Sequence, residues 1–65
     1  MLVNVNGENY SLTEPMTLAE LLLLLSPQAP FAVARNAEVV PRGRYGQCCV
    51  EHGDRIDIVH PAAGG

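Results

Sequence analysis

The sequence predicts an α+β domain in which one helix packs on one face of a mixed sheet of four or five short strands. Three observations support this prediction: an Asn-Gly turn between two alternating segments, one amphipathic helical stripe, and a last segment in which Ile56 and Ile58 alternate with other residues. With 65 residues, 48% of them hydrophobic, the chain has enough apolar side chains for one domain with a single modest core.

The first residues are predicted to form a β-hairpin. Val3 and Val5 alternate with polar residues, and the alternation resumes at Tyr10. Between them, Asn6 and Gly7 both tolerate a positive φ angle, as a type I′ turn requires. We therefore expect two paired strands, which end before Pro15 because proline lacks the donor for a central strand.

The helix is predicted to begin after Thr17. Thr17 and Glu20 have the spacing of a capping box, in which each side chain accepts a hydrogen bond from a free backbone amide of the first turn. Pro27 limits the helix, since the residue before proline avoids the α region. The apolar stripe is formed by Leu18, Leu21, Leu22 and Leu25.

Leu23 and Leu24 lie off this stripe. One interpretation is that they cover the rim of a small core. The alternative is that they form a contact surface for a partner or for a second copy, because contiguous exposed apolar surface usually marks a contact site.

The segment after the helix is predicted to form a third strand and, after a turn at Asn36, a short fourth strand over residues 38–40. Phe31 and Val33 are expected on one face of the third strand, because successive side chains point to opposite faces. The residues expected on its other face are Ala32 and Ala34.

The rest of the chain is predicted to hold an irregular segment over residues 42–47, a turn at Gly53-Asp54 and a final strand. On that strand Ile56 and Ile58 are expected to point inward. Asp57 and Val59 are expected to point outward, and Pro61 ends the strand.

Charge and hydropathy exclude several function classes. The net charge is −3 and only four residues are basic, so no basic face for nucleic acid is expected. The leucine run over residues 21–25 is much shorter than the roughly 20 residues of a membrane span. A secretory signal has basic residues before its apolar segment, and no basic residue precedes this leucine run. A cytoplasmic protein without membrane attachment is therefore expected.

No metal site is predicted. Cys48 and Cys49 are adjacent, so on a strand their sulfur atoms would point to opposite faces, and in the cytosol both are expected to be free thiols. Only His52 and His60 could join them as ligands. His60 is expected to be a solvated strand end, and Tyr45 is expected to pack at the edge of the core.

The order of elements, the segment ARNAEVVPR and the ending HGDRIDIVHPAAGG resemble the ThiS family of sulfur carrier proteins over the whole chain. This resemblance implies the ubiquitin-like β-grasp fold. Three features depart from the family pattern: Ala37 stands where glycine is frequent in the turn, His52 stands where aspartate is frequent, and adjacent cysteines are unusual. None of them touches the final glycine pair.

The resemblance also implies a function. An E1-like, ThiF-like adenylyltransferase would use ATP and Mg²⁺ to adenylate the carboxylate of Gly65. Sulfur from a donor such as a cysteine desulfurase would then give a thiocarboxylate. A ThiG-like thiazole synthase would take up that sulfur in thiamine biosynthesis. The chain itself would bind no cofactor and would be a protein cosubstrate rather than an enzyme.

These expectations divide the chain into a β-grasp domain over residues 1–60 and a flexible reactive tail over residues 61–65. Gly65 would be modified, and Gly64, with Ala63 and Ala62, would thread the narrow site of each partner because glycine lacks an obstructing Cβ. A partner-docking face is also predicted on the sheet. It consists of the outward residues of the third and final strands and a neighbouring arginine: Ala32, Ala34, Val59, Asp57 and Arg35.

Two alternatives remain open at this point. The related MoaD carriers and carriers of other pathways share the same tail chemistry. A β-grasp interaction module with an incidental glycine tail would also fit the sequence.

Overall fold

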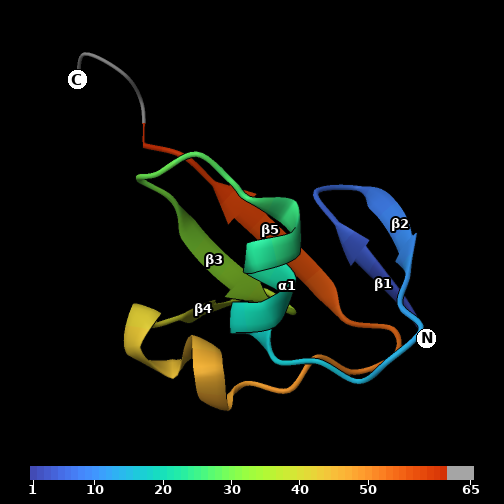
Figure 1. The fold of residues 1–65 in the computed structure, drawn as a ribbon. Coiled ribbons are helices and arrows are strands. Elements are labelled where there is room, and N and C mark those ends of the chain that lie inside the picture. Colours follow the sequence, from blue (N-terminus) through green and yellow to red (C-terminus); the bar gives the residue numbers. More distant parts are fainter. Residues whose placement is uncertain (62–65) are drawn as a thin grey trace.

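The computed structural model describes residues 1–61, and all of the predicted elements are present among them (Figure 1). A single helix, α1, lies across one face of a five-stranded sheet. The elements in chain order are β1 (Leu2–Val5), β2 (Glu8–Ser11), α1 (Leu18–Leu25), β3 (Ala32–Arg35), β4 (Glu38–Val40), the 3₁₀-helix η1 (Arg42–Gln47) and β5 (Arg55–Val59).

The sheet has the strand order β2-β1-β5-β3-β4, which places β5 in the centre. β1 and β5 run parallel, whereas β1 with β2, β3 with β4 and β3 with β5 are antiparallel pairs. The sheet is therefore mixed, and two hairpins flank the last strand. This arrangement confirms the predicted α+β class and the ubiquitin-like β-grasp fold.

The hydrophobic core lies between α1 and one face of the sheet. Leu18 and Leu21 of α1 are almost completely buried, and so are Val3, Val33 and Ile56 of the three central strands. The other buried core residues are Val5, Leu12, Leu22, Val50 and Ile58. The core residues of the helix and strands thus follow the hydrophobic repeats seen in the sequence, which are 3.6 residues along a helix and two residues along a strand.

The ends of α1 are fixed as the sequence predicts. The Thr17 side chain accepts a hydrogen bond from the backbone N–H of Glu20 at 3.2 Å, and the Glu20 carboxylate accepts one from the N–H of Thr17 at 2.9 Å. Ser26 closes the helix in the left-handed region, with φ 48°, immediately before Pro27. The helix stops there because the residue before a proline is kept out of the right-handed α region.

Two details differ from the prediction. Residues 42–47, expected to be irregular, form η1, in which the N–H of Arg44 bonds the carbonyl of Pro41 at 2.8 Å. A 3₁₀-helix of only six residues is too short to show a hydrophobic period by which a sequence pattern could reveal it. Tyr45 of η1 packs against the core, as predicted.

The second difference concerns Leu23 and Leu24. They are 79% and 69% exposed, so the interpretation that they cover the rim of the core is wrong.

In the part of the chain that the structure describes, no helix is long and apolar enough to cross a bilayer.

Candidate functional site

The candidate site is the end of β5, where the chain leaves the sheet toward residues 62–65. Ile56 and Ile58 point into the core, whereas Val59 is exposed, and so are His60 and Pro61 beyond it. The remaining predicted site residues lie outside the described residues: Ala62, Ala63, Gly64 and Gly65. Their predicted roles therefore stay predictions.

The side chain of Asn6 holds the end of β5. Backbone bonds of the parallel ladder run from the N–H of Asn4 to the carbonyl of Asp54 and from the N–H of Asn6 to that of Ile56, both at 2.9 Å. Beyond them, the amide of Asn6 donates to the carbonyl of Ile58 at 3.1 Å and accepts from the N–H of Ile58 at 2.7 Å. The Asn6 side chain therefore extends the ladder by one step, next to the point where the chain leaves the sheet.

Asn36 holds the beginning of β5 in a similar way. Its backbone N–H donates to the carbonyl of Arg55 at 2.8 Å, and its side-chain oxygen accepts from the N–H of Arg55 at 2.9 Å. Its amide nitrogen also donates to Asp54 at 3.1 Å. The two asparagines thus fix both ends of the strand that leads to the predicted reactive tail.

Asp54, the buried charged residue of the core, is the centre of a polar cluster. It accepts hydrogen bonds from Nε of Arg35 at 2.9 Å, from the N–H of Glu51 at 2.8 Å and from the amide of Asn36. Burial opposes ionisation of Asp54, but these hydrogen bonds together outweigh it and hold the pKa of the carboxyl below its ordinary value. The bond to Asp54 raises the pKa of Arg35 above its ordinary value.

The strand register tests which residues of the predicted docking face lie together. Ala32 pairs with Val59, and Ala34 pairs with Asp57, on the face of the sheet opposite α1. Val39 of β4, which is 76% exposed, lies opposite Ala34 and belongs to the same face. We call these five residues the outer face. The sequence analysis missed Val39, because only the pairing of β3 with β4 places it there.

Arg35 does not lie on the outer face, which corrects its predicted position beside Asp57. It pairs with Ile56, an inward residue, and its guanidinium binds Asp54 at the edge of the core. The positive charge beside Asp57 comes from Arg55 instead, whose Nε lies 3.2 Å from the Asp57 carboxylate. Arg35 has a structural role here because a buried carboxylate requires a charged partner.

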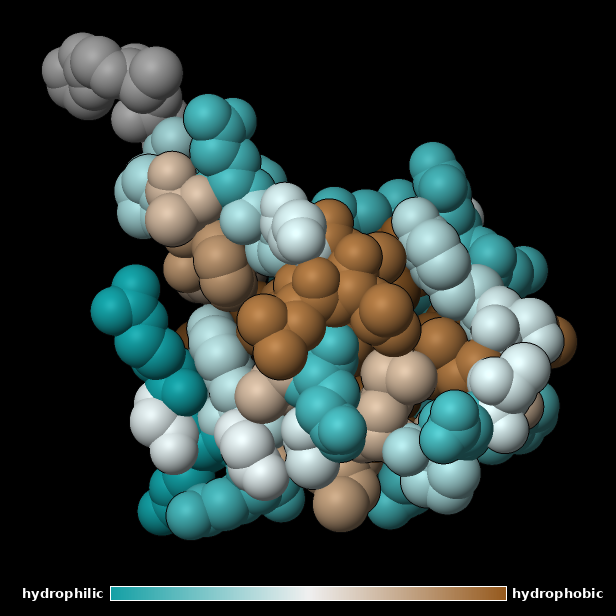
Figure 2. Space-filling model, in the orientation of Figure 1, coloured by the Kyte–Doolittle hydropathy of each residue, from teal (hydrophilic) through white to brown (hydrophobic). Residues whose placement is uncertain are grey.

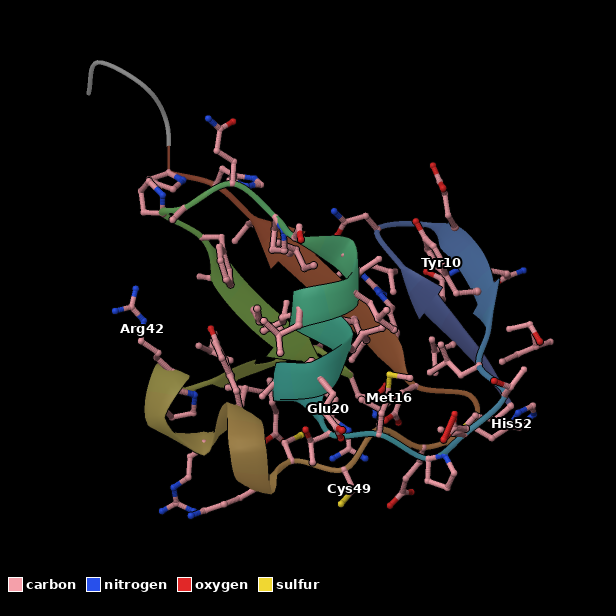
Figure 3. All side chains as sticks on the ribbon, in the orientation of Figure 1. Tyr10, Met16, Glu20, Arg42, Cys49 and His52 are labelled. Atoms are coloured by element: carbon pink, nitrogen blue, oxygen red, sulfur yellow. The ribbon has the colours of Figure 1, made fainter. Side chains whose placement is uncertain are left out.

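The cysteines and histidines are dispersed. Cys48 is half-buried against the core and its Sγ lies 3.5 Å from Nη1 of Arg35, whereas Cys49 is exposed. Figure 3 shows Cys49 and His52 on different parts of the surface. Among residues 1–61, no three His, Cys, Asp or Glu side chains are placed to hold a metal ion. His60 is exposed at the end of β5, as expected for a solvated strand end.

Known proteins similar to this chain agree with this geometry. The family model described as ThiS family matches residues 3–65. The crystal structure of the thiamine biosynthesis protein (ThiS) from Geobacter metallireducens superposes with a TM-score of 0.87, at 28% identity and with full coverage of both chains. An NMR structure of a thiamine biosynthesis protein from the same organism gives a TM-score of 0.79, also at 28% identity, and covers all of this chain and 88% of the other.

Two curated relatives are longer proteins. The thiazole synthase of Paramagnetospirillum magneticum is 39% identical over 62 residues, which make up 94% of this chain and 19% of that protein. The thiazole synthase of Magnetococcus marinus is 39% identical over 67 residues, which cover all of this chain and 20% of that protein. This chain therefore spans about a fifth of the length of these two relatives.

The fold and the position of the final strand agree with these matches. The family model covers nearly the whole sequence, and the fold superposes on that of a ThiS protein along its full length. The chain belongs to the ThiS family of sulfur carrier proteins.

Proposed function

We propose that the chain carries sulfur in thiamine biosynthesis as a thiocarboxylate at Gly65. Its membership of the ThiS family is the observation that carries this proposal, and the solved relatives are named as thiamine biosynthesis proteins. In this role the chain is a cosubstrate in the cytoplasm, and partner enzymes perform the chemistry.

The chemistry begins with a carboxylate, which is a poor electrophile because of its negative charge and resonance. A ThiF-like enzyme uses ATP and Mg²⁺ to join the Gly65 carboxylate to AMP, with release of pyrophosphate. The terminal sulfur of a persulfide, carried by a donor such as a cysteine desulfurase, then attacks the carbonyl and displaces AMP, which gives an acyl disulfide between carrier and donor. A thiol reductant cleaves the S–S bond of this disulfide and leaves the thiocarboxylate on the carrier. Because the sulfur is tethered to the carrier, its delivery to the acceptor is effectively intramolecular within the complex.

The structure supports this proposal through β5. Asn6 and Asn36 bind both ends of the strand, and Pro61 cannot donate a hydrogen bond to a neighbouring strand. The body that presents the tail is therefore well fixed up to Ile58. A rigid body lowers the entropy lost when a partner docks.

The two thiazole synthases that resemble this chain support a ThiG-like protein as the sulfur acceptor. In each of them the related segment occupies about a fifth of a longer polypeptide. We further propose that the outer face binds the activating enzyme, because its Ala32, Ala34 and Val59 side chains form a small apolar area beside the end of β5.

Deletion of Gly65 tests the proposed chemistry. The purified chain is incubated with an E1-like adenylyltransferase, ATP, Mg²⁺, a persulfide sulfur donor and a thiol reductant, and its intact mass is measured. We expect the full chain to gain one sulfur in place of one oxygen on its last peptide, and the deletion variant to gain nothing while its circular dichroism is unchanged.

The matched control is Gly43→Ala, since an added Cβ at Gly43 meets no atom within 4 Å. This variant should be modified like the wild type. Adenylation of the deletion variant at the wild-type rate would reject the proposal.

A further inference from the structure

The edge of β5 that faces β1 is completed by a side chain at its last step. β1 ends at Val5, and the carbonyl of Ile56 accepts from the backbone N–H of Asn6. The backbone polar groups of a strand point alternately to its two edges, so those of Ile58 are the next to face β1. The Asn6 side chain binds both of them, at 2.7 and 3.1 Å. It takes the place that a further residue of β1 would occupy.

The other edge of β5 is paired with β3 by regular backbone register. Val59, the last residue of β5, lies opposite Ala32, the first residue of β3. This pairing involves no side chain. The Asn6 side chain is therefore a support for the end of β5 that one substitution removes while the backbone pairing of the sheet stays in place.

The turn that carries Asn6 is fixed by a further asparagine. The side-chain oxygen of Asn4 accepts from the N–H of Gly7 at 3.0 Å, and its amide nitrogen donates to the side chain of Asn9 at 3.1 Å. Asn6 itself has a φ of 49°, which asparagine adopts more readily than most residues do. The Asn6 side chain is thus held toward β5 by the free molecule, without help from a partner.

Ile58 is close in sequence to the proposed site of chemistry. Gly65 lies seven residues further on, and Pro61, which has no N–H to donate, lies between them. An extended chain of seven residues spans at most about 25 Å, so a change of about 10° in its starting direction displaces its far end by about 4 Å. Misplacement of a reacting group by about 1 Å can lower a rate about a hundredfold. The direction of the chain at Ile58 therefore matters for a reaction at Gly65.

We infer that Asn6 is a positioning residue for the reaction at Gly65, an inference that rests on the proposed function. Because it fixes Ile58, Asn6 sets the direction in which the chain leaves the body that is docked on the activating enzyme. Loss of its bonds frees the last residues of β5, and this added backbone freedom must be lost again when the carboxylate enters the active site of the enzyme. Asn6 acts through Ile58 and touches no reacting atom.

Asn6 lies outside the two surfaces of the molecule that present apolar side chains. The outer face is formed by residues of β3, β4 and β5. On the other side, Figure 2 shows the most hydrophobic area over α1, the helix that carries the exposed Leu23 and Leu24. A substitution of Asn6 leaves the side chains of both surfaces in place. Its effect is therefore expected on the step after docking.

The test separates docking from turnover. The values of kcat and KM for the chain are measured by pyrophosphate release with the E1-like adenylyltransferase of the same organism, ATP and Mg²⁺. Asn6→Gly removes both bonds to Ile58, and glycine accepts the φ of 49°, so the turn is kept. We expect kcat to fall at least about tenfold. KM should stay within about twofold of the wild type, as for an interaction that acts only after binding.

The matched control is Asn36→Gly. Asn36 has the same place in its own turn, with a φ of 50°, and its side chain binds the beginning of β5 at Arg55. This variant also loses the bond to the buried Asp54, so it is destabilised at least as much as Asn6→Gly. We expect its kcat to stay within about twofold of the wild type, because it alters the end of β5 that is remote from Gly65. Circular dichroism checks that both variants are folded at the assay temperature.

A second variant, Asn6→Asp, keeps the acceptor for the N–H of Ile58 and loses the donor to its carbonyl. Its kcat should therefore lie between those of the wild type and Asn6→Gly. If Asn6→Gly is unfolded, Asn6→Asp takes its place in the test, with an expected fall in kcat of at least about threefold.

The outcomes separate this inference from the proposed function. A wild-type kcat after removal of the Asn6 bonds would overturn the inference while adenylation persists. An equal fall in kcat for Asn36→Gly would also overturn it, because loss of stability would then explain both variants. Failure of the wild-type chain to be adenylated would reject the proposed function instead.

Discussion

The two hairpins of the molecule have the same turn and different supports. Asn6-Gly7 joins β1 to β2, and Asn36-Ala37 joins β3 to β4, in each case followed by a glutamate. All four turn residues have positive φ angles: 49° and 86° in the first turn, 50° and 71° in the second. Each is therefore a type I′ turn, and in each the asparagine side chain binds the backbone of β5.

The difference lies in what each asparagine binds besides the strand. The side chain of Asn6 makes two neutral hydrogen bonds, both to the backbone of Ile58. Asn36 also binds the buried carboxylate of Asp54, which Arg35 neutralises. The end of β5 nearest the predicted reactive tail is thus held by neutral bonds, and the beginning of β5 is held by a charged cluster. The same short motif supports both ends of one strand by different physical means.

The largest effect is expected from Asp54→Asn. The Asp54 carboxylate pairs with Arg35, and an amide in its place leaves buried donors without an acceptor. The free energy of unfolding should therefore fall by about 2–3 kcal/mol. Urea denaturation at neutral pH measures this change. Glu51→Gln is the matched control, because the Glu51 side chain is 74% exposed and lies 3.8 Å from Arg35. If Glu51→Gln lowered the free energy of unfolding by more than about 0.5 kcal/mol, the ranking of Asp54 above Glu51 as the partner of Arg35 would be contradicted.

The dependence of stability on pH distinguishes the charged support of the second hairpin from the neutral support of the first. Because the pKa of Asp54 is lowered in the folded state, its contribution is fully present above the ordinary aspartate pKa of about 4 and is lost as the pH falls through the folded value. The wild type should therefore lose more stability than Asp54→Asn between about pH 5 and pH 2. Parallel curves for the two proteins would contradict the charged support of the second hairpin.

A smaller effect is expected from Asn6→Gly. Glycine accepts the φ of 49°, so this change removes the two bonds to Ile58 without straining the turn. We expect a loss of about 1–3 kcal/mol, because the backbone of Ile58 loses its partners. Amide exchange should accelerate most at Ile58. Unchanged protection at Ile58 would show that Asn6 does not hold the end of β5.

The smallest effect is expected from the second positions of the two turns. Ala37 has a φ of 71°, where a Cβ is unfavourable, so Ala37→Gly should stabilise the domain by about 0.5–1 kcal/mol after the added freedom of the unfolded chain is subtracted. Gly7→Ala, at a φ of 86°, should destabilise it by a similar amount. Thermal unfolding compares them, and the same sign for both changes would contradict the equivalence of the turns.

Much of the fold follows from local patterns. Asn-Gly between alternating segments, the capping box at Thr17 and Glu20, and the leucine stripe each specify an element through contacts only a few residues apart. Ile56 and Ile58 were predicted to face inward and are buried. The turn at Asn36 was also predicted, although Ala37 left its type open until the structure gave its φ angle.

Local sequence patterns predicted less of the candidate site than of the fold. The alternation of β3 and β5 places Ala32, Ala34, Asp57 and Val59 on outward positions, and the register confirms that they lie together. Arg35 was misplaced because the sequence gives no sign of Asp54, 19 residues away, as its partner. The repeat of Asn, a small residue and Glu at positions 6–8 and 36–38 was a signal that could have indicated two equivalent turns.

The sequence by itself determined the α-helix, the five strands and their inward faces, because periodicity, turn residues and caps act over one or two turns of chain. Only the tertiary structure decided that β5 lies between β1 and β3, that asparagines from two separate hairpins hold its ends, and that Leu23 and Leu24 stay exposed on α1. These features depend on contacts between residues that are distant in the chain, and such contacts exist only once the core has brought the strands together.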